Sequence, residues 1–441
     1  MLSFASSCVC IQLWCLLAFK VVGNIILQPK LRNLMENTAS TSQNVQVALR
    51  IRNTPTPKYR VMSPTRPGTS KSPTITSTEN PDILDISDTD PNSLIIIDPT
   101  NRKPPRQYTY DSILTSPTHS QAHLYDTQVR PIISKCMAGF NGCIFAYGMS
   151  GSGKTYTMEG PANMGINNPE RGVMMRAAEQ IVAIVQSLKS KPGLNTEISV
   201  TGTYLEIYQE HLRDLLEPRS DTELKIRFDP ISANGKDLFV EGLSERPLVV
   251  ESDYLKLITD GTRRRTVGET NINQVSSRSH AVLTIIINQY QKIKSGGSEI
   301  GGMKRSKLHL IDLAGSERTD ATGASGTRLK EGASINQSLL SLGNVINALS
   351  ANSTYIPYRD SKLTYLLSDS LGGNSLTLVL ACITPLSSAY EETGSTLRFA
   401  ERAKHVQNRA RINIDPSLLR FIFSDSGFFL WKLRLTRCDF N

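Results

Sequence analysis

An α/β sandwich is the fold class that this sequence predicts, and three observations lead to it. The chain has 441 residues, 39% hydrophobic and 20% charged, which is enough for one large domain or two ordinary ones. From residue 106 onward, stretches typical of strands alternate with stretches typical of helices, as expected of a sheet covered by helices. A glycine-rich loop follows an apolar strand and precedes a helix start near residue 150.

The strand candidates are short apolar or alternating runs. The first, at 45–52, reads VQVALRIR, which alternates and is rich in residues that favour strands. The other strand candidates lie at 142–146, 198–208, 282–290, 307–313 and 376–383.

Four segments carry the apolar spacing of helices, at 122–137, 173–188, 335–349 and 362–371. The third has the clearest signal, an apolar stripe made by Ile335, Leu339, Leu342, Ile346 and Leu349. Ser334 and Gln337 form a capping-box pattern, which predicts that this helix begins there.

The ends of the chain and one long stretch do not follow this pattern. Residues 1–43 form an atypical N-terminal segment, whose apolar part at 2–19 also matches a signal peptide or a short anchor. A signal peptide normally has a basic start and a cleavage site with small residues, and this segment shows neither. We therefore favour an atypical segment over a signal peptide or anchor, and we expect no stable membrane insertion. Residues 53–95 are rich in Pro, Ser and Thr and are predicted to be a surface insertion, disordered at its centre. The tail at 418–441 stays unassigned and shows no heptads, so a monomer without a coiled coil is expected.

The net charge indicates what kind of partner the chain binds, and the cysteines indicate the redox state of its compartment. The net charge of +9 favours an acidic partner, which is nucleic acid, an anionic membrane or an acidic protein surface. The seven cysteines are scattered and show no CxxC pair, which argues against a disulfide scaffold or a zinc site. A reducing compartment is expected.

The glycine-rich loop matches the phosphate-binding pattern G-x-x-x-x-G-K-[ST]. Its glycines let backbone N–H groups surround phosphates, Lys154 neutralises the β and γ oxygens, and the Thr155 hydroxyl can bind Mg²⁺. The alternative is a Gly-Ser turn that happens to hold a lysine, but the strand before it and the helix after it favour nucleotide binding. The loop residues are Gly148, Met149, Ser150, Gly151, Ser152, Gly153, Lys154 and Thr155.

Two further polar segments stand at strand ends. The apolar run 307–311 ends in Asp312, a carboxylate that can support Mg²⁺ through water, and Gly315 and Glu317 follow. The second segment, 273–280, precedes an apolar strand with adjacent hydroxyls, an arginine and a histidine that suit metal, water and phosphate contacts. An ordinary polar loop is the alternative reading of the second segment.

Together these segments resemble the kinesin family over about residues 45–415. FAYGMSGSGKTYTMEG at 145–160 looks like its P-loop, NQVSSRSH at 273–280 like switch I and DLAGSER at 312–318 like switch II. The segments at 329–349 and 355–375 resemble the relay helix and the tubulin-facing segment after it. Residues 395–413 resemble the last motor helix and the start of the neck linker.

The resemblance implies a P-loop NTPase of three layers, with a mixed central β-sheet flanked by helices on both faces. The motor domain would cover 44–408 and a neck-linker-like segment 409–417. It implies a microtubule-stimulated ATP hydrolase in the cytoplasm, on the cytoskeleton, with ATP and Mg²⁺ as ligands and tubulin rather than nucleic acid as partner. A microtubule binder without turnover and another P-loop NTPase are the alternatives. An early-chain motor followed by a neck linker suggests plus-end movement, also by resemblance alone.

The roles of single residues also come from the resemblance. Thr155, Ser277 and Asp312 would hold Mg²⁺, Asp312 through water. Arg278 and Glu317 would form an ion pair that gates the attacking water, and Gly315 would meet the γ-phosphate. The nucleotide pocket would include Arg50, Tyr156, Asn273 and Ser276, with the base between Arg50 and Tyr156. Arg359 and Lys362 would face tubulin.

Three positions depart from the family pattern. Asn53 follows Arg52 where a proline is usual, Tyr365 replaces an arginine, and Gly394 replaces a leucine. None of these changes touches the phosphate chemistry.

Overall fold

The computed structural model describes residues 41–52, 83–87, 89–115, 119–161, 168–190, 196–217, 223–229, 237–267, 277–295, 298–317 and 327–413. The chain divides into two units, Met1–Thr41 and Ser42–Asn441, and the described residues other than Thr41 belong to the second. Within the described residues, no helix combines the length and apolar character needed to cross a membrane.

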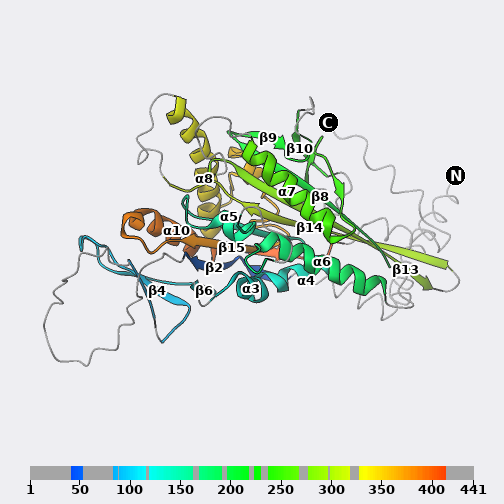
Figure 1. The fold of residues 1–441 in the computed structure, drawn as a ribbon, viewed down its shortest axis with the longest axis horizontal. Coiled ribbons are helices and arrows are strands. Elements are labelled where there is room, and N and C mark those ends of the chain that lie inside the picture. The colour runs from blue at the N-terminus through cyan, green and yellow to red at the C-terminus, as the bar shows by residue number, and fades with distance from the viewer. Residues whose placement is uncertain are drawn as a thin grey trace, which may run out of the picture. The chain divides into compact units, whose positions relative to one another are not determined.

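A mixed sheet of nine strands forms the middle layer (Figure 1). The strand order is β12-β8-β13-β14-β7-β15-β2-β6, and β9 pairs with β8. From β14 to β6 neighbouring strands run parallel, whereas β12, β8, β9, β13 and β14 are joined antiparallel. The bounds are β2 (Gln46–Ile51), β6 (Ser112–Thr115), β7 (Gly142–Tyr147), β8 (Thr196–Tyr208), β9 (His211–Asp214), β12 (Arg246–Pro247), β13 (His280–Ser295), β14 (Ser298–Asp312) and β15 (Leu376–Ile383). The predicted mixed α/β sheet is confirmed.

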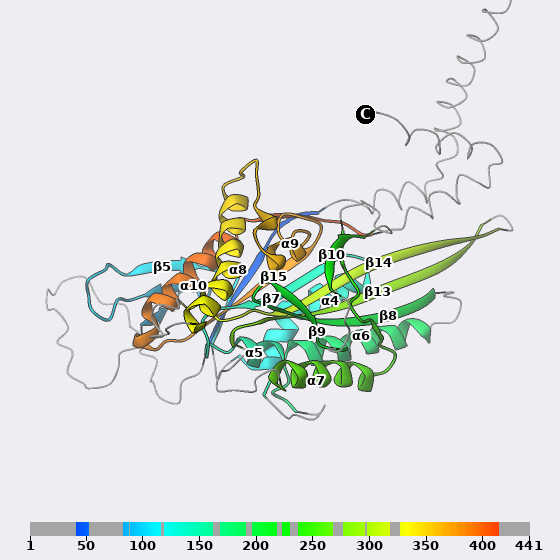
Figure 2. The ribbon, with the colours of Figure 1, turned by 90° about the horizontal axis from the view of Figure 1, so that it is seen from above.

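Helices cover both faces of this sheet, which Figure 2 shows edge-on. Alternate residues of a strand point to opposite faces, so β7 sends Ile144 and Ala146 into one core and Cys143 and Phe145 into the other. The first core is closed by α4 (Arg130–Met137), α5 (Lys154–Met158), α6 (Val173–Lys189) and α7 (Glu251–Val267). The second is closed by α8 (Thr327–Ser350), α9 (Lys362–Leu366) and α10 (Tyr390–Ala403).

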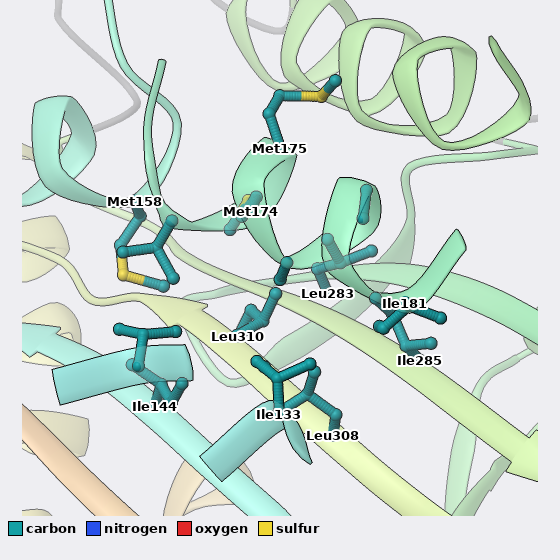
Figure 3. Close-up of a cluster of buried hydrophobic side chains, with 14 of the residues drawn as sticks. Ile133, Ile144, Met158, Met174, Met175, Ile181, Leu283, Ile285, Leu308 and Leu310 are labelled. Atoms are coloured by element: carbon teal, nitrogen blue, oxygen red, sulfur yellow. The ribbon is translucent and has the colours of Figure 1, made fainter. Parts of the chain in front are cut away.

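The first core shows why these segments fold together. Ile133 of α4, Ile144 of β7 and Ile181 of α6 meet Leu283 and Leu310 of the two central antiparallel strands (Figure 3). Strand β7 is buried along its entire length, as expected of a central parallel strand with helices on both faces. The phosphate-loop sequence at its end is therefore anchored on a rigid element.

Three small sheets complete the fold. β3 (Leu84–Ile86), β4 (Ser93–Ile96) and β5 (Arg106–Thr109) pair in that order, β10 (Lys225–Phe228) pairs with β11 (Leu238–Glu241), and β1 (Thr41–Asn44) pairs with β16 (Gln407–Ala410). β3 and β4 fall in the last part of the stretch predicted as an insertion, whose residues 53–82 lie outside the described residues, as do 1–40 and 414–441.

Three predicted helices have different bounds in the structure. The helix predicted at 335–349 begins at Thr327, so Ser334 lies inside it and the predicted capping box is wrong. The apolar stripe shows which face of the helix is buried, but it does not show where the helical hydrogen bonds begin. The helix predicted at 362–371 ends at Leu366, and the chain continues from there in tight turns. The segment predicted at 122–137 divides into α3 (Gln121–Leu124), a π-helix (Tyr125–Val129) and α4. Two short 3₁₀ turns lie at Tyr358–Asp360 and Ser387–Ala389.

Candidate functional site

The glycine-rich loop has the backbone conformation that its sequence requires. Gly148, Gly151 and Gly153 have φ values of 147°, 77° and 102°, a region that other residues rarely adopt. A side chain at Gly148 would also collide with the backbone, because its Cβ would lie 2.1 Å from the Cys382 carbonyl oxygen. The loop between β7 and α5 therefore forms a concave backbone turn of the kind that binds anions.

Lys154 and Thr155 begin α5 and point to different partners. Lys154 is buried, and its Nζ donates to the Met149 carbonyl at 3.0 Å, across the loop. Burial lowers the pKa of Lys154, against the opposing pull of Asp312 and Glu317. A buried cation whose charge is disfavoured gains most when an anion such as a phosphate binds beside it.

Thr155 and Asp312 bring an oxygen-rich group to the end of β14. Thr155 Oγ1 donates to Asp312 Oδ2 at 2.7 Å, which joins the loop to the strand that ends in Asp312. The other oxygen, Asp312 Oδ1, is buried and has no hydrogen-bond partner in the described part of the chain. Hydroxyl and carboxylate oxygens are the ligands that Mg²⁺ prefers, so this pair fits that ion, with water completing its shell.

Arg265 of α7 is a site residue that sequence reasoning missed. It is 1% exposed, and its Nη1 donates to Asp312 Oδ2 at 2.7 Å while its Nη2 donates to the Ser279 carbonyl at 2.8 Å. Glu159 Oε1 lies 3.6 Å away. Burial alone would lower the pKa of Arg265, but Asp312 and Glu159 outweigh it and the pKa is raised. The spacing on α7 indicates burial of position 265, since it continues the buried stripe of Leu257, Ile258 and Gly261, but it does not indicate the partner Asp312.

The segments after β14 and before β13 meet at the loop. The Gly315 N–H donates to the Ser277 carbonyl at 2.8 Å, and the Ser316 N–H donates to the Gly148 carbonyl at 3.1 Å. The two strand ends and the phosphate loop thus form one hydrogen-bonded group. Asn273 and Ser276, predicted as part of the same site, lie outside the described residues.

Glu317 contacts the phosphate loop. Ser150 donates to both oxygens of its carboxylate, from N at 2.8 Å and from Oγ at 2.5 Å. The carboxylate folds over Gly315, where an added Cβ would lie 2.3 Å from Glu317 Oε2. The ion pair between Glu317 and Arg278 stays a prediction.

His280 connects the same group to α8 and does not point at the phosphate loop. Its Nδ1 accepts from the Ala314 N–H at 3.0 Å, so the proton is on Nε2, which donates to Ser338 Oγ at 2.7 Å. Burial, with Arg265 and Lys154 nearby, lowers the pKa of His280 to about 3, so the ring is neutral. This histidine ties the end of the sheet to the long helix α8.

The predicted base pocket brings Arg50 and Tyr156 into direct contact. The Arg50 guanidinium carbon lies 5.1 Å from the centre of the Tyr156 ring, a cation–π distance. A base stacked between two planar groups, in van der Waals contact with both, needs them to be roughly 7 Å apart. The distance between Arg50 and Tyr156 in this structure is shorter than that. Tyr156 also donates from its hydroxyl to Glu170 and is 37% exposed, which leaves ring surface open to a ligand.

The two cations predicted to face tubulin lie on neighbouring turns. Arg359 lies over the ring of Tyr365, 5.8 Å from its centre, and the Lys362 N–H donates to Glu210 Oε2 at 2.6 Å. The tyrosine that replaces an arginine thus holds Arg359 by a cation–π contact, whereas an arginine at 365 would repel it.

Comparisons with known proteins agree with this geometry. The profile described as kinesin motor domain matches residues 64–406. Kinesin-like protein Klp68D of Drosophila melanogaster is 45% identical over 316 residues, which are 72% of this chain and 38% of that protein. The chain thus spans less than two thirds of that relative's length.

Similar solved structures include that of a fast kinesin, with a TM-score of 0.68, 36% identity, and coverage of 85% of this chain and 95% of the other. A second is a KIF14 dimer bound to AMP-PNP in complex with a microtubule, with a TM-score of 0.71 and 32% identity. It covers 87% of this chain and 100% of the other.

Proposed function

This chain belongs to the kinesin family, and we propose that it is a microtubule-stimulated ATP hydrolase whose nucleotide state sets its affinity for microtubules. The observation that carries the proposal is the hydrogen-bonded group around the phosphate loop. In it, Ser316 bonds Gly148, Gly315 bonds Ser277, and Thr155 bonds Asp312. A ligand that enters the loop must therefore act on both switch segments at once.

The chain supplies phosphate binding and charge neutralisation. Lys154 and the backbone N–H groups of 148–155 hold the β and γ phosphates of ATP. Thr155, Ser277 and, through water, Asp312 would hold Mg²⁺, which when bound neutralises the phosphate oxygens. Catalysis of this type needs positioning and electrostatic stabilisation and no side-chain nucleophile.

Glu317 has two positions in the proposed cycle. In this structure its carboxylate accepts hydrogen bonds from Ser150. ATP binding would release it to pair with Arg278, and that pair would orient the attacking water and relay its proton. Loss of phosphate would return Glu317 to the loop.

A path from the switches to α8 supports the coupling to microtubules. His280 bonds Ala314, which follows β14, and Ser338, which lies on α8. A shift at the end of β14 is therefore transmitted to that helix. An open pocket of about 340 Å³, lined by Glu317, Asn344 and Arg402 among others, lies between α8 and α10. Discrete rearrangements of this kind are how small changes at one site reach a distant surface.

Tubulin is the proposed partner and the microtubule cytoskeleton in the cytoplasm the proposed location. The basic balance of the chain suits an acidic surface, and Arg359 and Lys362 are the cations proposed to meet it. The solved complex of a KIF14 dimer with a microtubule supports the same partner.

ATP turnover measured with and without microtubules tests the proposal. Strong stimulation by microtubules is the expected result. Binding to microtubules without turnover would favour a kinesin-like binder, and neither binding nor stimulation would favour another P-loop enzyme.

A further inference from the structure

We infer that Gln121 is a positioning residue for the nucleotide base: it holds the Arg50–Tyr156 pair and so sets ATP affinity without acting on the phosphates. The inference rests on the proposed function, since it takes the loop at 148–155 as an ATP site. Gln121 opens α3, directly after Ser120, whose Oγ accepts from the His123 N–H at 3.2 Å and caps the helix. The side chain of Gln121 is 1% exposed.

The amide of Gln121 uses both of its ends. Its Oε1 accepts from Arg50 Nη1 at 2.7 Å. Its Nε2 donates to the Tyr156 carbonyl at 2.6 Å and to the Glu170 carbonyl at 3.3 Å. A single side chain therefore joins β2, α5 and the segment before α6.

These three contacts are also the supports of the base platform, meaning Arg50 and Tyr156. Arg50 Nη1 has a second bond, to Thr157 Oγ1 at 2.8 Å, and its guanidinium covers one side of the Tyr156 ring. The Tyr156 hydroxyl donates to the Glu170 carboxylate. Gln121 thus holds Arg50 by its side chain and Tyr156 and Glu170 by their backbones, so losing it loosens every member of the platform.

The residue type matters because the three partners need both an acceptor and donors from one planar group. An alanine supplies neither. A glutamate keeps the acceptor for Arg50 but has no N–H for the Tyr156 and Glu170 carbonyls, and its charge would face two carbonyl oxygens.

The link from Gln121 to the phosphate loop is indirect. It runs through Arg50 to Thr157 Oγ1, which donates to the Gly153 carbonyl at 2.7 Å. Within the described residues, none of the hydrogen bonds of Gln121 reaches Gly148–Lys154, whereas Lys154 bonds Met149 inside the loop. Replacing Gln121 should therefore weaken the binding of ATP, which carries a base. It should leave the binding of inorganic tripolyphosphate, which carries no base, unchanged.

The fold offers a matched control in Gln180. It is a second largely buried glutamine, whose Oε1 accepts from the Tyr125 hydroxyl at 2.5 Å and whose Nε2 donates to the Arg130 carbonyl at 3.1 Å and Ser134 Oγ at 3.0 Å. Its partners lie on the π-helix and α4, none of them in the base platform. Replacing it removes as many bonds from the same fold.

The experiment compares Gln121→Ala, Gln121→Glu and Gln180→Ala for KM and kcat with ATP, and for inhibition by tripolyphosphate. For Gln121→Ala we expect KM to rise about tenfold, which corresponds to about 1.4 kcal/mol, with kcat and tripolyphosphate inhibition within twofold of the parent. Gln121→Glu should raise KM by less, and Gln180→Ala should leave it unchanged while lowering the melting temperature.

Three results would overturn the inference: an unchanged KM in both Gln121 variants, an equal loss of ATP and tripolyphosphate binding, or the same KM rise in Gln180→Ala. If Gln121→Ala does not fold, the Gln121→Glu variant decides between the same outcomes. A parent chain that does not hydrolyse ATP would instead reject the proposed function.

Discussion

Replacing Arg265 by glutamine should strongly destabilise the protein. The change removes the bonds to Asp312 Oδ2 at 2.7 Å and to the Ser279 carbonyl at 2.8 Å, and leaves the carboxylates of Asp312 and Glu159 buried without their cation. Removing one partner of a buried ion pair costs about 3–5 kcal/mol. A domain with a total stability of about 5–15 kcal/mol keeps little in reserve after such a loss.

The loss should also depend on pH in a particular direction. Burial already raises the pKa of Glu159, and Arg265 holds it down. Without Arg265 the folded-state pKa rises further above the unfolded value, so the folded state favours the protonated acid. The penalty is therefore largest near pH 7.5 and shrinks as the pH falls toward the unfolded pKa of about 4.3.

Denaturant unfolding of the parent and two variants at pH 7.5 and 5.5 measures this. Arg263→Gln is the matched control, because Arg263 lies on the same helix with its side chain 71% exposed and 4.0 Å from Asp260, a pair worth less than about 1 kcal/mol. The reasoning is refuted if Arg265→Gln costs no more than Arg263→Gln, or if its cost grows on acidification.

Other substitutions test single steps of the account. Lys154→Ala should abolish ATP turnover, because the phosphates lose their buried cation; turnover at the parent rate would reject the phosphate-site assignment. Glu317→Ala should bind ATP and leave it unhydrolysed, since the water gate is lost while Ser150 and the loop remain, and mostly ADP after a single turnover would contradict this. His280 should make the fold acid-sensitive: with a folded pKa of about 3 and an unfolded pKa near 6.5, stability is full above pH 6.5 and about 2 kcal/mol is lost by pH 5. A His280→Gln variant should show a flatter stability profile between pH 7 and 5, and an equally steep profile would exclude His280 as the cause. Gly394→Ala should raise stability by about 1 kcal/mol, because the glycine lies inside α10 and its added Cβ would meet only a flexible arginine end at 3.3 Å and a methyl group at 3.8 Å; a lower melting temperature would show that the arginine cannot move aside.

Local patterns predicted the phosphate loop and the sheet well, since each depends on neighbours in sequence. Strand β7 is an apolar run, and the loop glycines are adjacent to it, so both could be recognised directly. Gln121 and Arg265 could not be found in the same way. Gln121 meets Arg50 across 71 residues, and Arg265 meets Asp312 across 47, so only the folded sheet brings them together.

Helix bounds were harder to predict than helix positions. The stripe from Leu339 to Ile346 located α8 correctly, because burial of one face has a helical period. It did not locate the start at Thr327, since a helix can extend beyond the part that packs against a core. At α9, Leu367 and Leu371 are buried in turns that follow the helix, and their spacing alone suggested that the helix continued.

The coupling of nucleotide to microtubule affinity is tested most directly by co-sedimentation of the parent chain with microtubules, in a non-hydrolysable ATP analogue and in ADP. The account predicts clearly tighter binding in the ATP analogue, because the γ-phosphate draws in both switches and His280 passes the shift to α8. Equal affinity in the two nucleotides would contradict it, since the site would then bind nucleotide without acting on the microtubule face.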